Sequence, residues 1–175
     1  NRASTVELNN VTATATNNAV MIATAAGAVK LTINDSDLTG LAVVNVAGAG
    51  SEVVINNTKI TNVDASSAEQ YGAITVWSSA AGAQVTVNGG SITVADDSRK
   101  AYVFPGDAEV DGVDDVGYIV ATIGDAGFET LASAINKAKA GETIKLLRDI
   151  TASEILTIDK AITLDGNGKT LTSTA

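Results

Sequence analysis

The sequence predicts an all-β fold: a parallel β-helix, or solenoid, with one amphipathic helix. Three observations predict it. A short strand motif recurs along the chain, a looser second strand follows most copies, and the side chains available for a core are small. Ala, Thr, Val, Asn and Gly dominate, and aromatic residues make up only 3 % of the 175 residues. Small β-branched and aliphatic side chains favour thin, regular, repetitive sheets.

The recurring motif is an apolar residue, any residue, a second apolar residue, and then Asn or Asp. Its copies are Val6-x-Leu8-Asn9, Leu31-x-Ile33-Asn34, Val53-x-Ile55-Asn56, Val85-x-Val87-Asn88 and Ile162-x-Leu164-Asp165. The first positions of the first four copies lie 25, 22 and 32 residues apart. Period-2 alternation between Asn and Gly turns, repeated at such intervals, is typical of a solenoid, so each repeat is expected to be one coil.

The polar residue that ends each motif has two interpretations. At the same turn of successive coils, side-chain amides can stack and hydrogen-bond in a ladder along the axis. Alternatively, Asn tolerates the left-handed backbone conformation of a turn. Because the polar residue always follows the same inward-facing pair, we favour the ladder. Its expected members are Asn9, Asn34, Asn56, Asn88 and Asp165.

A helix is expected at about residues 129–139. Phe128, Leu131, Ile135 and Ala138 fall at helical spacing and form one apolar stripe. Acidic Glu129 lies near the start of the stripe, Lys137 and Lys139 lie near its end, and Gly141 follows, as the helix dipole and a glycine stop favour.

From this helix onward the sequence resembles a known family. The stretch GFETLASAINKAKAGETIKLLRDITASEILTIDKAITLDGNGKTLT is similar to the start of the right-handed, pectin-lyase-like parallel β-helix domains of large bacterial surface proteins. The resemblance implies a right-handed solenoid whose first coil is capped by the amphipathic helix. It also implies that a domain begins near residue 118.

The sequence therefore divides into three predicted segments. Residues 1–104 are expected to be later coils of a β-helix, 105–117 an acidic linker, and 118–175 the capping helix and first coils of a β-helix. The chain opens and closes inside expected strands. Counted across a join of residue 175 to residue 1, Ile162 and Val6 lie 19 residues apart, against 18 from Ile144 to Ile162. The two ends are therefore expected to be complementary.

Three arrangements would satisfy complementary ends. The chain could be a slice of a tandem array, or a circularly permuted domain whose residues 105–117 run back along the outside. It could also give its cap and first coils to a neighbouring copy. We favour this head-to-tail exchange, which does not close and generates a filament, with the tandem array close behind.

Composition excludes several function classes. The chain has no cysteine and no histidine, which removes disulfides, thiolate chemistry and the commonest general base and metal ligand. A net charge of −9 argues against a nucleic-acid partner. No apolar run approaches the length that spans a bilayer, so membrane insertion is not expected.

The segment GDAEVDGVDD is a candidate calcium loop. Asp107, Glu109 and Asp111, followed by a glycine and later by Asp115, resemble the start of an oxygen-rich calcium site. The position that would hold a bidentate Glu is Tyr118. An acidic, solvated linker is the favoured alternative, so no cofactor is expected other than this calcium candidate.

Tyr71 and Trp77 are candidate ligand contacts. They lie close together in the longest expected coil, and sugar sites often expose aromatic rings. The alternative is that Trp77 fills the interior of an enlarged coil. Enzymatic cleavage of polysaccharides, which some relatives of this fold perform, is a weaker hypothesis, because Asp35 and Asp37 are better explained as turn formers.

The function expected from the sequence is structural. We expect a repeat or subunit of an extracellular, cell-surface fibre that assembles head to tail with copies of itself and has no enzymatic activity. The alternative is an adhesin or carbohydrate-binding module that contacts surface glycans. A polysaccharide-degrading enzyme ranks third.

Overall fold

A computed structural model describes residues 4–63, 71–95 and 99–175. The chain divides into two compact units, unit 1 (residues 1–117) and unit 2 (residues 118–175), which are described separately. The structure is mostly β, with parallel sheets and one α-helix among the described residues. No helix in the described part of the chain is long and apolar enough to cross a bilayer.

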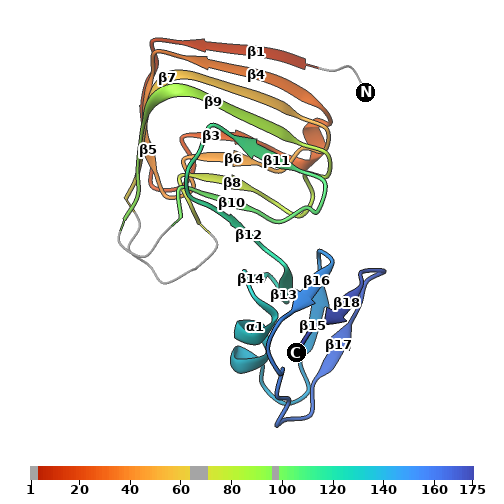
Figure 1. Cartoon of the computed structure of the whole chain (residues 1–175). Coiled ribbons are helices and arrows are strands. Elements are labelled where there is room, and N and C mark those ends of the chain that lie inside the picture. Colours follow the sequence, from red (N-terminus) through yellow and green to blue (C-terminus); the bar gives the residue numbers. More distant parts are fainter. Residues whose placement is uncertain (1–3, 64–70, 96–98) are drawn as a thin grey trace. The chain divides into compact units, whose positions relative to one another are not determined.

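The first sheet of unit 1 has seven strands (Figure 1). They are β1 (Ser4–Asn9), β2 (Thr12–Thr14), β4 (Val29–Asn34), β5 (Asp37–Gly40), β7 (Glu52–Asn62), β9 (Gln84–Thr93) and β11 (Glu109–Asp111). The pairs β1–β4, β4–β7, β7–β9 and β9–β11 are parallel, as are β2–β5 and β5–β7. The long strands β7 and β9 therefore span both the β1–β4 and the β2–β5 parts of the sheet.

The second sheet of unit 1 has five short strands. They are β3 (Val20–Ile22), β6 (Val44–Val46), β8 (Ile74–Val76), β10 (Ala101–Val103) and β12 (Val116–Tyr118). The pairs β3–β6, β6–β8 and β8–β10 are parallel. A single 3₁₀ turn (Thr24–Ala26) follows β3 within the described residues.

The chain of unit 1 alternates between the two sheets (Figure 1). Strands β1 and β2 lead to β3, β4 and β5 lead to β6, β7 leads to β8, β9 leads to β10, and β11 leads to β12. Each passage returns one strand further along the first sheet, in register: Leu8, Ile33, Ile55 and Val87 occupy equivalent positions. The repeated strand motif of the sequence thus marks equivalent strands of successive passages.

The core of unit 1 lies between the two sheets and consists of stacked Val, Ile and Leu side chains. In β4 the alternate residues Val29, Leu31 and Ile33 are buried, and in β7 the pattern continues with Val53 and Ile55. Period-2 alternation places these residues on one face of each strand. Burying a side chain of this size contributes roughly 1.5–3 kcal/mol, so a repeated stack stabilises the unit without large rings.

The predicted acidic linker at residues 105–117 is wrong. Residues 109–111 form β11, which pairs with β9, and residues 116–118 form β12 in the second sheet. Ala108 and Val110 are buried in the core, whereas Glu109 and Asp111 on either side of Val110 are exposed. Alternation puts the charges on the outer face of a strand, which is why the segment has a linker-like composition.

Unit 2 combines antiparallel and parallel pairing. Its strands are β13 (Ala121–Ile123), β14 (Ala126–Phe128), β15 (Thr143–Leu146), β16 (Ile150–Ala152), β17 (Thr163–Asp165) and β18 (Leu171–Ser173). Strand β13 pairs antiparallel with β14 and β15, whereas β15–β17 and β16–β18 are parallel. Within the described residues, β17 pairs only with β15 and β18 pairs only with β16, so each has an open outer edge.

The helix of unit 2, α1 (Leu131–Lys137), lies inside the predicted range but is shorter. Thr130 is its N-cap, and the Thr130 side-chain oxygen accepts a hydrogen bond from the Ser133 backbone N–H at 3.1 Å. Phe128, expected at the start of the helical stripe, instead ends strand β14. The cap at Thr130 explains this limit, because an N-cap residue has extended rather than helical backbone angles.

Candidate functional site

Four of the predicted ladder residues form a continuous row of side-chain hydrogen bonds in unit 1. The Nδ2 atom of Asn34 donates to Oδ1 of Asn9 at 2.7 Å, Asn56 donates to Asn34 at 2.7 Å, and Asn88 donates to Asn56 at 3.0 Å. The strand register aligns the same four residues. Every amide donates toward β1, so the row has a direction.

The left-handed turn that competed with the ladder interpretation lies one residue further on. Asn10, Asp35, Asn57 and Gly89 have φ values of 53°, 48°, 44° and 73°. These are the residue types that tolerate a positive φ. The Nδ2 atom of Asn57 donates to Oδ1 of Asp35 at 2.8 Å, so this position also links neighbouring strands. The first three repeats therefore use two consecutive polar residues for two different purposes, and the fourth has Gly89 at the second position.

Asp165 does not join this row. It belongs to unit 2, in register with Lys145, and its Oδ1 atom accepts a hydrogen bond from the backbone N–H of Asn167 at 2.9 Å. Asn167 has a φ of 47°. The carboxylate thus organises the turn that follows β17, and its remaining lone pairs stay exposed to solvent.

The edge of the first sheet at β1, here called the β1 edge, leaves one end of the core of unit 1 uncovered. Val6 is in register with buried Leu31, yet it is 41 % exposed, and Leu8 is only partly buried. Asn9 accepts the last hydrogen bond of the row, and its own Nδ2 has no acceptor among the described residues. The β1 edge therefore presents an apolar stack end next to a free amide donor.

The outer edges of β17 and β18, here called the β17–β18 edge, are the open end of unit 2. Leu164 is in register with fully buried Ile144 but is 39 % exposed, and Leu171, opposite Ile150, is 40 % exposed. These leucines continue the core face of the preceding strands with no strand beyond them in the described part of the chain. Each unit thus ends in an uncovered stack of aliphatic side chains.

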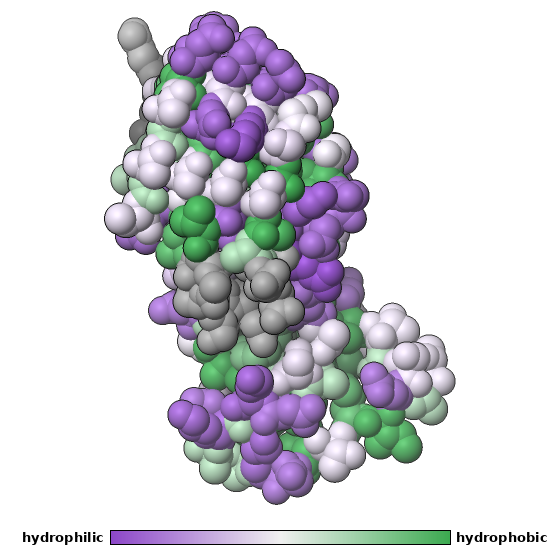
Figure 2. Space-filling model, turned by 90° about the vertical axis from the view of Figure 1, so that its left-hand side faces the viewer, coloured by the Kyte–Doolittle hydropathy of each residue, from purple (hydrophilic) through white to green (hydrophobic). Residues whose placement is uncertain are grey.

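The outer surface of unit 1 has a different character from these stack ends. On the face drawn in Figure 2, hydrophilic and weakly hydrophobic residues cover most of unit 1, and hydrophobic residues come in small groups. Paired charges on this surface include Lys30–Glu52 and Lys59–Asp37, at 2.7 and 2.9 Å. Exposed pairs of this kind contribute little to stability, so the outer faces add solubility more than cohesion.

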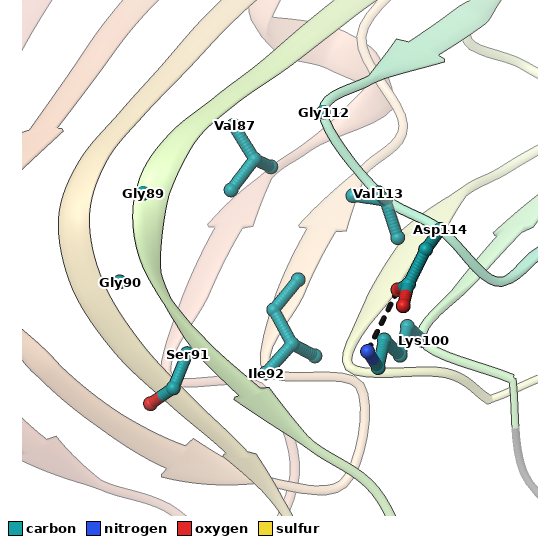
Figure 3. A pocket seen from close by; sticks show the side chains of 9 residues that line it. All are labelled: Val87, Gly89, Gly90, Ser91, Ile92, Lys100, Gly112, Val113 and Asp114. Atoms are coloured by element: carbon teal, nitrogen blue, oxygen red, sulfur yellow. Dashed lines mark hydrogen bonds and ion pairs between the residues drawn. The ribbon is translucent and has the colours of Figure 1, made fainter.

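A groove of about 310 Å³ lies where the last passage through the first sheet is shortest (Figure 3). Strand β11 pairs only with residues 84–86 of β9, so the later part of β9 has no further strand beside it among the described residues. The groove is lined by Val87, Gly89, Gly90, Ser91, Ile92, Lys100, Gly112, Val113 and Asp114.

One ion pair lies at this groove. Lys100 Nζ contacts Asp114 Oδ1 at 2.7 Å, and this hydrogen bond lowers the pKa of the exposed Asp114 carboxyl below its ordinary value of 3.8 (Figure 3). Sequence reasoning missed this pair, because nothing in the sequence shows that the bends before the neighbouring strands β10 and β12 bring together two residues 14 positions apart. With its charges already paired, the groove offers no assembled catalytic group.

The calcium candidates do not gather into a site. Glu109 and Asp111 extend from the outer face of β11, Asp107 lies in the preceding turn, and Asp115 pairs with Arg99 at 2.8 Å. Within the residues that the structure describes, no three carboxylates come close enough to hold a metal ion. Spacing along the chain resembled a calcium loop, but strand geometry spreads the carboxylates apart.

Tyr71 and Trp77 do lie together. Their ring centroids are 5.6 Å apart in an edge-to-face arrangement, and Trp77 stacks on Phe104 at 5.1 Å. Phe104 is buried, whereas Tyr71 and Trp77 are half-buried. Trp77 therefore packs on a core ring, as expected if it fills the interior of an enlarged coil. It also presents part of its surface to solvent, as a ligand contact requires.

Comparisons of the chain with protein-family models, with curated proteins and with solved structures gave no match. The functional hypotheses therefore rest on the geometry of the chain itself. Its most distinctive features are the directional asparagine row and the two open stack ends.

Proposed function

We propose that this chain is a structural repeat or subunit of an extracellular surface fibre, in which right-handed β-helices join head to tail. The β-helix interpretation of unit 1 is supported by its parallel strands, its alternation between two sheets and its in-register asparagine row. Right-handedness is supported by the strong preference of parallel crossover connections for that hand. The resemblance of unit 2 to capped, pectin-lyase-like β-helices favours the same fold there.

One observation carries the proposal: both units leave an aliphatic stack and an open parallel strand uncovered. Val6 at one edge and Leu164 and Leu171 at the other are 39–41 % exposed, whereas their in-register neighbours Leu31 and Ile144 are buried. Open strand edges are templates for further strands, and solenoids need caps to remain soluble. Two different edges on one molecule generate an open, head-to-tail assembly.

Sedimentation velocity over nanomolar to micromolar concentrations tests this function. A fibre subunit is expected to shift from small to steadily larger species as concentration rises, without stopping at a dimer. A single monomeric species across the whole range would refute assembly as the function. Protease accessibility on intact producing cells would test the proposed surface location.

A glycan-binding role is the second candidate, and the aromatic cluster favours it. Trp77 has one face supported by buried Phe104 and a neighbouring edge formed by Tyr71, an arrangement that can stack on a sugar ring. A glycan array compared between the natural chain and Trp77→Ala tests it. Binding that disappears in the variant is the expected result, and unchanged or absent binding would eliminate the role.

Polysaccharide cleavage remains the least supported hypothesis. Asp35, which could belong to a carboxylate pair, accepts a hydrogen bond from Asn57, and Asp37 pairs with Lys59. These contacts favour structural work in the turns between strands.

A further inference from the structure

We infer that the β17 strand of one copy docks on the β1 edge of a second copy in one specific register, in which Leu164 lies opposite Leu8 and Asp165 lies opposite Asn9. This inference rests on the proposed assembly and names the contact that would make it. Three independent features of the two edges select the same register.

The first feature is the direction of the asparagine row. Each amide donates to the preceding strand, so the row ends at Asn9 with a donor to spare. A strand docking there must supply an acceptor at that position. The fifth copy of the strand motif supplies Asp165, whose ionised carboxylate only accepts. Its bond from the Asn167 backbone leaves a second carboxylate oxygen available for Asn9 Nδ2.

The second feature is the phase of the backbone. The backbone N–H of Asn10 donates to the backbone oxygen of Asn34. The backbone N–H and C=O groups of even-numbered residues in the β1 strand therefore point toward β4, and those of odd-numbered residues point toward the open edge. The backbone N–H of Thr163 donates to the backbone oxygen of Glu142, so the backbone groups of odd-numbered residues in β17 point toward β15. The backbone N–H and C=O of Leu164 therefore point toward the open edge. In a parallel pair a residue bonds to the two residues that flank its partner. Leu164 opposite Leu8 therefore bonds to the backbone groups of Glu7 and Asn9, which have no backbone partner among the described residues. A one-residue shift would instead direct Leu164 to backbone groups that already bond to β4.

The third feature is the apolar stack. The same register sets Ile162 beside Val6 and Leu164 beside Leu8, joining the uncovered end of one core to that of the other. After each strand the chain turns through a residue of positive φ, Asn10 or Asn167, and continues into β2 or β18. In this arrangement Leu171 of β18 would lie next to Ala13 of β2. Leu171 follows Leu164 by seven positions and Ala13 follows Leu8 by five, so the two additional residues of unit 2 would form a loop on the outside.

A swap of the hydrogen-bonding groups tests the Asn9–Asp165 contact. Asn9→Asp keeps the acceptor that Asn34 uses but removes the free donor and places two carboxylates together. We expect self-association to weaken at least about tenfold, as like charges in an interface do. Asp165→Asn in the same chain restores a donor–acceptor pair, and association is expected to return to within about threefold of the natural chain. Asn136→Asp, an exposed site on α1, is the control for net charge.

A disulfide tests the register directly, because the chain contains no cysteine. The Glu7→Cys/Thr163→Cys pair would be adjacent, at about 4.8 Å between Cα atoms, which a disulfide can bridge. The shifted control pair, Glu7→Cys/Ala161→Cys, would be about 8 Å apart and out of reach. Covalent multimers from the first pair only, under mild oxidation, are the expected result.

Other results overturn the inference in distinguishable ways. Multimers that form but crosslink only through the shifted pair would reject the register and leave the assembly function standing. A disulfide within single chains would reject a second copy as the occupant. A natural chain that never associates would reject the proposed function, and with it this contact.

Discussion

Strands β4 and β17 carry the same motif, yet they differ sharply in burial. In unit 1, Leu31 and Ile33 of β4 lie between β1 and β7 and are almost completely buried. In unit 2, Leu164 of β17 has a neighbour on one side only and stays 39 % exposed. The motif decides that a strand forms and which face turns inward. Burial requires a further strand on each side, so the stability of a repeat depends on its neighbours.

The largest loss of stability is expected from a substitution in the middle of the aliphatic core stack of unit 1. Ile55→Ala removes a fully buried side chain that has stacked neighbours on both sides and leaves a cavity, which costs about 2–5 kcal/mol of unfolding free energy. Urea unfolding followed by circular dichroism measures it.

The matched change at the open end is Leu164→Ala, expected to cost less than about 1 kcal/mol when the chain is dilute. Equal losses at the two sites would contradict the difference between enclosed and open strands.

A second large effect is expected at Gly112, beside the groove. A Cβ there would lie 2.0 Å from the Val87 carbonyl oxygen, and the residue has a φ of +77°. Gly112→Ala therefore combines a backbone clash with backbone strain and should destabilise unit 1 by more than about 2 kcal/mol.

Gly82 is the control for this substitution, because it has a similar φ of +67° and no heavy atom near its Cβ position. Gly82→Ala is expected to cost only about 1 kcal/mol in thermal unfolding. If both substitutions have the same cost, the close approach of the chain at Gly112 is not a constraint.

A smaller effect separates the interior of the asparagine row from its end. Asn56→Ala removes one hydrogen bond on each side and should cost about 1–3 kcal/mol. Asn9→Ala removes a single, exposed bond and should cost less than about 1 kcal/mol in the dilute chain. Chemical unfolding of both variants checks the order, and a larger loss at Asn9 would contradict it.

The smallest effect is the pH dependence of the Lys100–Asp114 pair. Because its pKa is lowered in the folded chain, Asp114 contributes stability above its ordinary pKa of 3.8, and this contribution is lost as pH falls through the lower folded value. Asp114→Asn should therefore melt slightly below the natural chain at pH 7 and equally with it well below pH 3.8. Asp125→Asn, in unit 2, controls for the loss of one negative charge. A difference that persists in acid would assign the effect to something other than this carboxylate.

Most strands of unit 1 could be predicted because each repeat carries its own pattern. Alternation fixed the inward residues, and the polar residue after each pair marked the turn. The segment around Val110 was misjudged because a strand of three residues is too short for alternation to outweigh the five acidic side chains of residues 105–117. The hairpin of β13 and β14 was missed because Phe128 also fits the helical stripe of Leu131 and Ile135.

The candidate site was only partly predictable for a different reason. Asparagine at equivalent positions predicted a ladder, but its direction depends on which way each amide is turned. The ion pairs Lys100–Asp114 and Arg99–Asp115 depend on how neighbouring strands align, which no local pattern encodes. The calcium candidates do not form a metal-binding group among the described residues, because Glu109 and Asp111 lie on strand β11 whereas Asp107 and Asp115 lie outside it.

Negative-stain electron microscopy of the purified chain, at nanomolar and at micromolar concentration, tests the central claim most directly. If the two open edges join different copies, filaments are predicted at micromolar concentration and short particles after dilution, with Asn9→Asp shifting the balance toward the particles. Uniform short particles at both concentrations would contradict head-to-tail assembly.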